Sequence, residues 1–75
     1  MDIPTISADF NNADRYGRVR LNTKGTFEDI DRLKIEFKEN MKVLLDDNDG
    51  LTTIGNLKYS VEENIWVAEI NWVSL

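Results

Sequence analysis

The chain contains no histidine and no cysteine in its 75 residues. Histidine is the usual general base near neutral pH, and activated nucleophiles usually need a histidine neighbour or a thiol. Zinc sites draw on the same two residue types, and disulfide bonds need cysteine. We therefore expect no enzyme and no cofactor, and a small core that is stabilised by apolar packing, with or without self-association.

Long apolar runs and a clustered basic face are also missing. The chain has fourteen acids against nine bases, a net charge of −5, and the nearest approach to a basic cluster is Arg15, Arg18 and Arg20. Nucleic-acid binding normally needs such a cluster to displace phosphate counterions, and a membrane span needs about 20 apolar residues. We expect neither nucleic acid nor membrane as a partner, and the cytoplasm as the location, since the first residues lack the features of a signal peptide.

The hydrophobic pattern divides the chain near residue 16. Residues 1–16 carry the chain's one proline and only isolated apolar residues, so they predict an N-terminal arm, irregular or weakly extended, whose flexibility the sequence leaves open. Residues 17–75 are then a single small domain. Within it, residues 18–23 alternate polar and apolar, which predicts a half-buried strand with Val19 and Leu21 facing the core.

Residues 26–46 have two interpretations. Apolar residues spaced by three and four positions would suit one long amphipathic helix. Asn40, however, tolerates the left-handed backbone of a turn, and residues 41–46 resemble a mostly buried strand. We favour a short helix over about 27–34 with Thr26 as its N-cap, followed by a turn at Asn40 and then the strand.

The last third of the chain predicts a meander of strands. The acidic stretch 46–50 ends in Asp-Gly, a hairpin turn signal. A strand that begins near residue 51 is expected to pause at a bulge at 55–56, and residues 65–72 form the strongest strand pattern. The predicted fold is mainly β, a small strongly bent antiparallel sheet or SH3-like barrel with one short helix. The alternative is an α+β fold with one long helix on an antiparallel sheet.

Three aromatic residues, Tyr59, Trp66 and Trp72, are the candidate binding site. Tryptophan and tyrosine are favoured in interface hot spots, and small barrels recognise peptides through aromatic grooves. The same residues are natural filling for a thin core. Core packing is the favoured interpretation for Trp66, whereas Trp72, three residues from the end of the sequence, suits either role.

The acidic turn at residues 46–50 is a candidate cation site. An EF-hand loop needs acids at positions 1, 3 and 5, glycine at position 6 and glutamate at position 12. Counting from the turn glycine puts Leu45 at position 1 and Asn56 at position 12, so an EF-hand is rejected. A weak Ca²⁺ or Mg²⁺ site at Asp46, Asp47 and Asp49 is the minor alternative to a solvated hairpin tip.

Three stretches together, residues 18–26, 41–47 and 66–72, resemble a small uncharacterised bacterial family with an Arg-Val-Arg-Leu-Asn-Thr-x-Gly-Thr opening and a Trp-Val-Ala-x-Ile-Asp-Trp closing strand. This chain differs from the family pattern at Asn40, where the family has glycine, and at Asn71, where it has aspartate. The resemblance implies a break near residue 40. It implies no activity, because the family has none assigned.

Two functional hypotheses follow. The first is a non-enzymatic protein-interaction module that contacts a protein partner or a second copy of itself. The second is an acidic inhibitor, of the antitoxin or immunity type, that binds a basic partner. Salt dependence separates them, because binding through charge weakens steeply with ionic strength.

Overall fold

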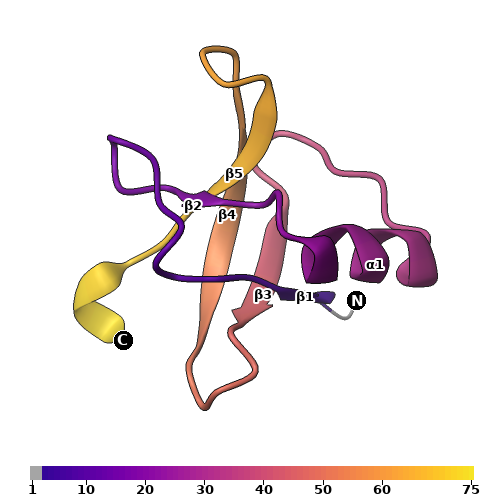
Figure 1. Ribbon diagram of the computed structural model, residues 1–75, viewed down its shortest axis with the longest axis horizontal. Helices are drawn as coiled ribbons and strands as arrows, with labels where there is room; N and C mark the ends of the chain where they lie inside the picture. Colours follow the sequence, from indigo (N-terminus) through magenta and orange to yellow (C-terminus); the bar gives the residue numbers. More distant parts are fainter. Residues whose placement is uncertain (1–2) are drawn as a thin grey trace.

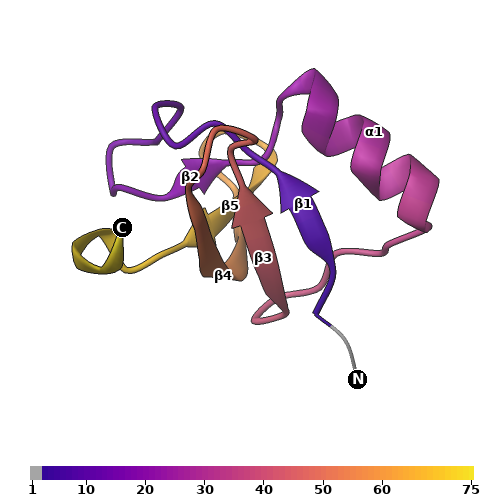
Figure 2. The same ribbon diagram turned by 90° about the horizontal axis from the view of Figure 1, so that it is seen from below.

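The computed structural model describes residues 3–75 of the chain, apart from the side chain of Ser74. Its elements are β1 (Thr5–Ser7), β2 (Val19–Arg20), α1 (Lys24–Leu33), β3 (Lys42–Asp46), β4 (Thr52–Ser60), β5 (Ile65–Glu69) and the 3-10 helix η1 (Trp72–Ser74). The strands form one sheet in the order β1-β3-β4-β5-β2, strongly curled into a half-barrel (Figure 1, Figure 2). The expected mainly β fold, a small bent sheet or SH3-like barrel with one short helix, is confirmed.

The sheet is mixed, which corrects the expected fully antiparallel arrangement. β1 runs parallel to β3, with Ile6 opposite Leu45, whereas the other strand pairs are antiparallel. A parallel pair needs a long crossover, and here the crossover contains β2 and α1. The strand order could not be read from hairpin signals, because these report only neighbours in the chain.

The described part of the expected N-terminal arm, residues 3–16, belongs to the domain. Ile6 has no exposed surface, and Ala8 and Phe10 are also buried. They join the inner face of the sheet in one core, which consists of Ile6, Ala8, Phe10, Val19, Leu21, Val43, Leu45, Leu57 and Ala68. A boundary at residue 16 would expose three of these side chains to water, so the domain includes the segment before it.

Helix α1 is short, as favoured, but it begins earlier than expected. Its N-cap is Thr23, whose Oγ1 accepts a hydrogen bond from the N–H of Thr26 at 3.2 Å. Thr26 itself is buried, and its Oγ1 donates to the carbonyl of Ser7 at 2.6 Å, while the Asp29 carboxylate accepts from the Ser7 N–H at 2.8 Å. Helix α1 lies beside β1 (Figure 2). Its side chains therefore hydrogen-bond the main-chain N–H and C=O at the outer edge of that strand.

The long-helix alternative is wrong. Helix α1 ends at Leu33, Lys34 adopts a left-handed conformation, and Asn40 has a φ of 66°. The residues after Asn40 enter β3, as the favoured interpretation predicted.

Strand β4 runs without the bulge that was expected at 55–56. Gly55 lies opposite Val43 in regular register, and a Cβ on Gly55 would stand 2.9 Å from the Cβ of Ala68. The glycine allows close packing across the inside of the curled sheet instead of breaking the strand. The last strand, β5, ends at Glu69, three residues before the predicted end, so Trp72 lies in η1.

Candidate functional site

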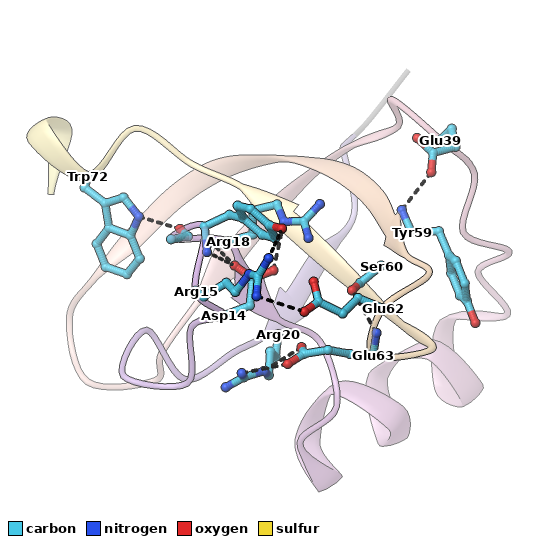
Figure 3. A network of polar contacts seen from close by, with 12 residues as sticks. Asp14, Arg15, Arg18, Arg20, Glu39, Tyr59, Ser60, Glu62, Glu63 and Trp72 are labelled. Carbon is cyan, nitrogen blue, oxygen red and sulfur yellow. Dashed lines mark hydrogen bonds and ion pairs between the residues drawn. The ribbon is translucent and has the colours of Figure 1, made fainter.

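The structure divides the three candidate aromatic residues between two places. Tyr59 and Trp66 are cross-strand partners whose rings meet edge to face at 5.3 Å. Trp72 lies far from them: Figure 3 shows Tyr59 and Trp72 at opposite ends of the polar network. The single aromatic surface that the sequence suggested is therefore two separate surfaces.

The Tyr59–Trp66 pair lines a small apolar cavity beside α1. Phe37 also meets the ring of Trp66 edge to face, at 5.8 Å. The cavity has a volume of about 160 Å³ and is lined by Leu21, Phe27, Ile30, Phe37, Tyr59, Asn64, Ile65 and Trp66. Trp66 is half-buried and packs against the core, in agreement with the structural role that was favoured for it.

Trp72 is fixed in place and yet accessible. Its indole Nε1–H donates to the carbonyl of Gly17 at 2.6 Å, and its ring meets Phe10 edge to face at 6.5 Å. The side chain keeps 42% of its surface exposed. An aromatic ring held on two sides loses little side-chain entropy when a partner covers its remaining surface.

Trp72 forms one wall of the larger cavity, which we call the Trp72 groove. The groove has a volume of about 440 Å³ and is lined by Tyr16, Gly17, Arg18, Glu69, Ile70 and Trp72. It opens where β2 and β5 separate, since their pairing covers only two residue pairs, Val19 with Ala68 and Arg20 with Val67. Gly17 turns the chain away at this point with a φ of 78°.

An ion pair with a buried carboxylate supports the part of the groove that Tyr16 and Arg18 line. The Asp14 carboxylate accepts hydrogen bonds from Arg18 Nε at 2.8 Å and from the N–H groups of Tyr16 and Arg18 at 2.9 Å. Burial raises the pKa of Asp14, but these hydrogen bonds outweigh burial and hold the pKa below its ordinary value. The guanidinium groups of Arg15 and Arg18 lie over the Tyr16 ring, 4.9 and 5.0 Å from its centroid.

The three neighbouring arginines each contact a carboxylate (Figure 3). Arg18 is paired with Asp14, Arg15 with Glu62, and Arg20 makes two hydrogen bonds to Glu63. The hydrogen bonds from Arg20 lower the pKa of Glu63. This paired arrangement offers phosphate groups little uncompensated positive charge.

Glu69, at the rim of the Trp72 groove, differs from the other carboxylates nearby. It is exposed, and it makes no ion pair with any residue between 3 and 75. Its negative charge is available at the rim of the groove.

The acidic hairpin tip is shaped by its own carboxylates. Asp46 accepts from the N–H of Asn48, and Asp47 accepts from the N–H groups of Asp49 and Leu51. No group of three or more acidic side chains in the described part of the chain is arranged to hold a metal ion. We assign these carboxylates to turn formation.

Comparison with protein-family models, curated proteins and solved structures finds no match. The resemblance to a small bacterial family thus remains a prediction. Within residues 3–75, no helix has the length and apolar character needed to span a membrane. The site must therefore be interpreted from its own geometry.

The sequence did not indicate three residues of the groove, Tyr16, Gly17 and Ile70. They carry no distinctive local pattern, because only the fold brings them to Trp72.

Proposed function

We propose that this protein is a non-enzymatic protein-interaction module and that it binds its partner through the Trp72 groove. One observation carries the proposal: Trp72 is held rigidly by Gly17 and Phe10 while much of its ring stays exposed in the wall of a cavity of about 440 Å³. Interface hot spots favour tryptophan and tyrosine, and the groove contains one of each.

The volume and composition of the groove suit a peptide segment or a projecting loop. Ligand sites commonly measure roughly 300–1,000 Å³ and combine apolar walls with a few polar groups. Here the walls come from Trp72, Tyr16 and Ile70, and the polar groups from Arg18 and Glu69. The chain has no histidine and no cysteine, and this argues against catalysis in the Trp72 groove.

The second candidate is an acidic inhibitor of the antitoxin or immunity type. The net charge of −5 and the exposed Asp49 at the hairpin tip support it. It predicts a basic partner whose binding weakens steeply with salt. The groove proposal predicts a weaker salt dependence, since apolar contact with Trp72 contributes most of the affinity.

The test is capture of a partner with the tagged protein and with Trp72→Ala as the comparison bait. Val73→Ala is the matched control, because Val73 is more exposed than Trp72 but does not line the groove. Tyr16→Ala removes the other aromatic ring that lines the groove without touching the core, and it guards against a folding defect in Trp72→Ala. A partner lost with both groove variants and kept by Val73→Ala supports the proposal. Equal recovery by all four baits contradicts it, and elution by moderate salt alone favours the inhibitor.

A further inference from the structure

The pairing of β2 with β5 stops just short of the Trp72 groove. The register Val19 to Ala68 would bring Gly17 opposite Ile70 if the ladder continued. Gly17 instead donates its N–H to the carbonyl of Asp14 at 3.0 Å and accepts from the Trp72 indole at 2.6 Å. Both main-chain groups of Gly17 therefore make hydrogen bonds outside the ladder, and Gly17 does not pair with Ile70.

The main-chain groups of Ile70 lie on the β2 side of β5. Trp66 directs its carbonyl to the N–H of Leu21 at 3.0 Å, and Ala68 pairs with Val19. Because alternate residues of a strand direct their N–H and C=O to the same side, the groups of Ile70 follow in that direction, into the groove. Among the described atoms of residues 3–75, which leave out the side chain of Ser74, neither group makes a hydrogen bond.

At two other edge positions of this sheet, main-chain groups find partners within the chain. The N–H and C=O of Ser7 in β1 bind Asp29 and Thr26 of α1. In β2, Arg20 donates its N–H to the carbonyl of Asn12 at 2.8 Å. Natural sheets protect their edges in this way. The unprotected N–H and C=O of Ile70 inside the groove therefore need an explanation.

We propose that the Trp72 groove takes an extended peptide segment of a partner protein, which pairs with the main chain of Ile70 and directs a lysine or arginine to Glu69. The inference rests on the proposed function and names the partner's chemistry. An extended main chain supplies the acceptor and the donor that Ile70 lacks. Glu69, exposed and without an ion pair in the described chain, supplies the complementary charge, and the ring of Trp72 packs against an apolar side chain of the same segment.

The experiment begins with phage-displayed random heptapeptides selected on the folded protein, followed by synthetic copies of the strongest binder. Amide hydrogen exchange of the ¹⁵N-labelled protein then reports on the Ile70 N–H directly. We expect rapid exchange in the free protein and at least about tenfold slower exchange with saturating peptide. We also expect N-methylation of one internal peptide residue to weaken binding by about tenfold, roughly the loss of one hydrogen bond.

Glu69→Gln tests the charge, with Asp49→Asn as a control that removes the same charge from the distant hairpin tip. We expect Glu69→Gln, but not Asp49→Asn, to weaken binding of the peptide and to reduce the selection of lysine and arginine in the peptides. Binding that needs Trp72 but leaves the Ile70 amide unprotected and tolerates N-methylation at every position overturns this inference and leaves the proposed function standing. A failure to select any peptide that depends on Trp72 overturns the extended peptide, and it contradicts the proposed function as well if all four baits recover the partner equally. Protection of Ile70 that rises with protein concentration alone identifies a second copy as the occupant and overturns the partner peptide.

Discussion

The Trp72 indole donates its Nε1–H to the carbonyl of Gly17 at 2.6 Å, across 55 residues of sequence. This contact fixes the C-terminal turn against the loop that leads into β2. It also uses the carbonyl that would otherwise continue the β2–β5 ladder, so one hydrogen bond both positions the exposed ring and opens the groove beside it.

Replacing Trp72 with phenylalanine keeps a ring against Phe10 but removes the donor. We expect Trp72→Phe to lower the free energy of unfolding by about 1 kcal/mol, the usual net value of one hydrogen bond. Urea denaturation measures this change. Val73→Ala, which keeps the hydrogen bond, should be close to neutral, and equal stability of Trp72→Phe and the parent would contradict the role of the indole N–H.

Gly55 leaves room for Ala68 across the curled sheet. In Gly55→Ala the new methyl group meets the Cβ of Ala68 at 2.9 Å and Leu45 Cδ1 at 3.2 Å, and we expect a loss of ~1–3 kcal/mol from overpacking. Adding Ala68→Gly removes the closest clash. The double variant should therefore be more stable than the sum of the two single changes predicts, and strict additivity in urea denaturation would count against this contact.

Thr26 connects α1 to the edge of β1. Thr26→Val keeps the shape of the side chain but leaves the Ser7 carbonyl without its donor at 2.6 Å. We expect a loss of about 1–3 kcal/mol, because the affected groups are largely buried. Hydrogen exchange should quicken in β1 more than in β4, and unchanged exchange in β1 would argue that the helix does not secure this edge.

Stability should fall in acid because two carboxylates have lowered pKa values. Hydrogen bonds from Arg18 and Tyr16 lower the pKa of Asp14 despite its burial, and hydrogen bonds from Ser7 lower that of Asp29. A lowered folded-state pKa contributes stability that is complete above the unfolded value near 3.8 and is lost as the pH falls through the folded value. Asp14→Asn and Asp29→Asn should each flatten this dependence in urea midpoints taken from pH 7 to pH 3. Plots of the urea midpoint against pH that run parallel to that of the parent protein would contradict the lowered pKa values of these two carboxylates.

Local chemistry explains which parts of the fold were predictable. Asn40 turns the chain because asparagine tolerates a positive φ, and its identity alone indicated the break before β3. Val19 and Leu21 face the core because alternation in a strand is a local pattern. Gly55 was misread as a bulge, since a glycine that makes room for a distant side chain has the same sequence signal as one that breaks a strand.

Contacts between distant segments explain what was missed. The parallel partner of β1 lies 39 residues away, as in Thr5 with Leu44, and nothing near β1 encodes that pairing. Trp72 was identified as a candidate from its residue type and position. Its hydrogen bond to Gly17 and the unpaired main chain of Ile70 depend on the curled sheet, so the groove itself required the structure.

Fluorescence of Trp72 tests the central claim most directly. The chain has two tryptophans, so Trp66→Phe leaves Trp72 as the only one. On titration of this variant with the captured partner or the selected peptide, we predict that emission from Trp72 moves to shorter wavelength as its exposed surface is covered, while an unrelated peptide leaves it unchanged. Unchanged emission from Trp72 at saturation would contradict binding in the groove.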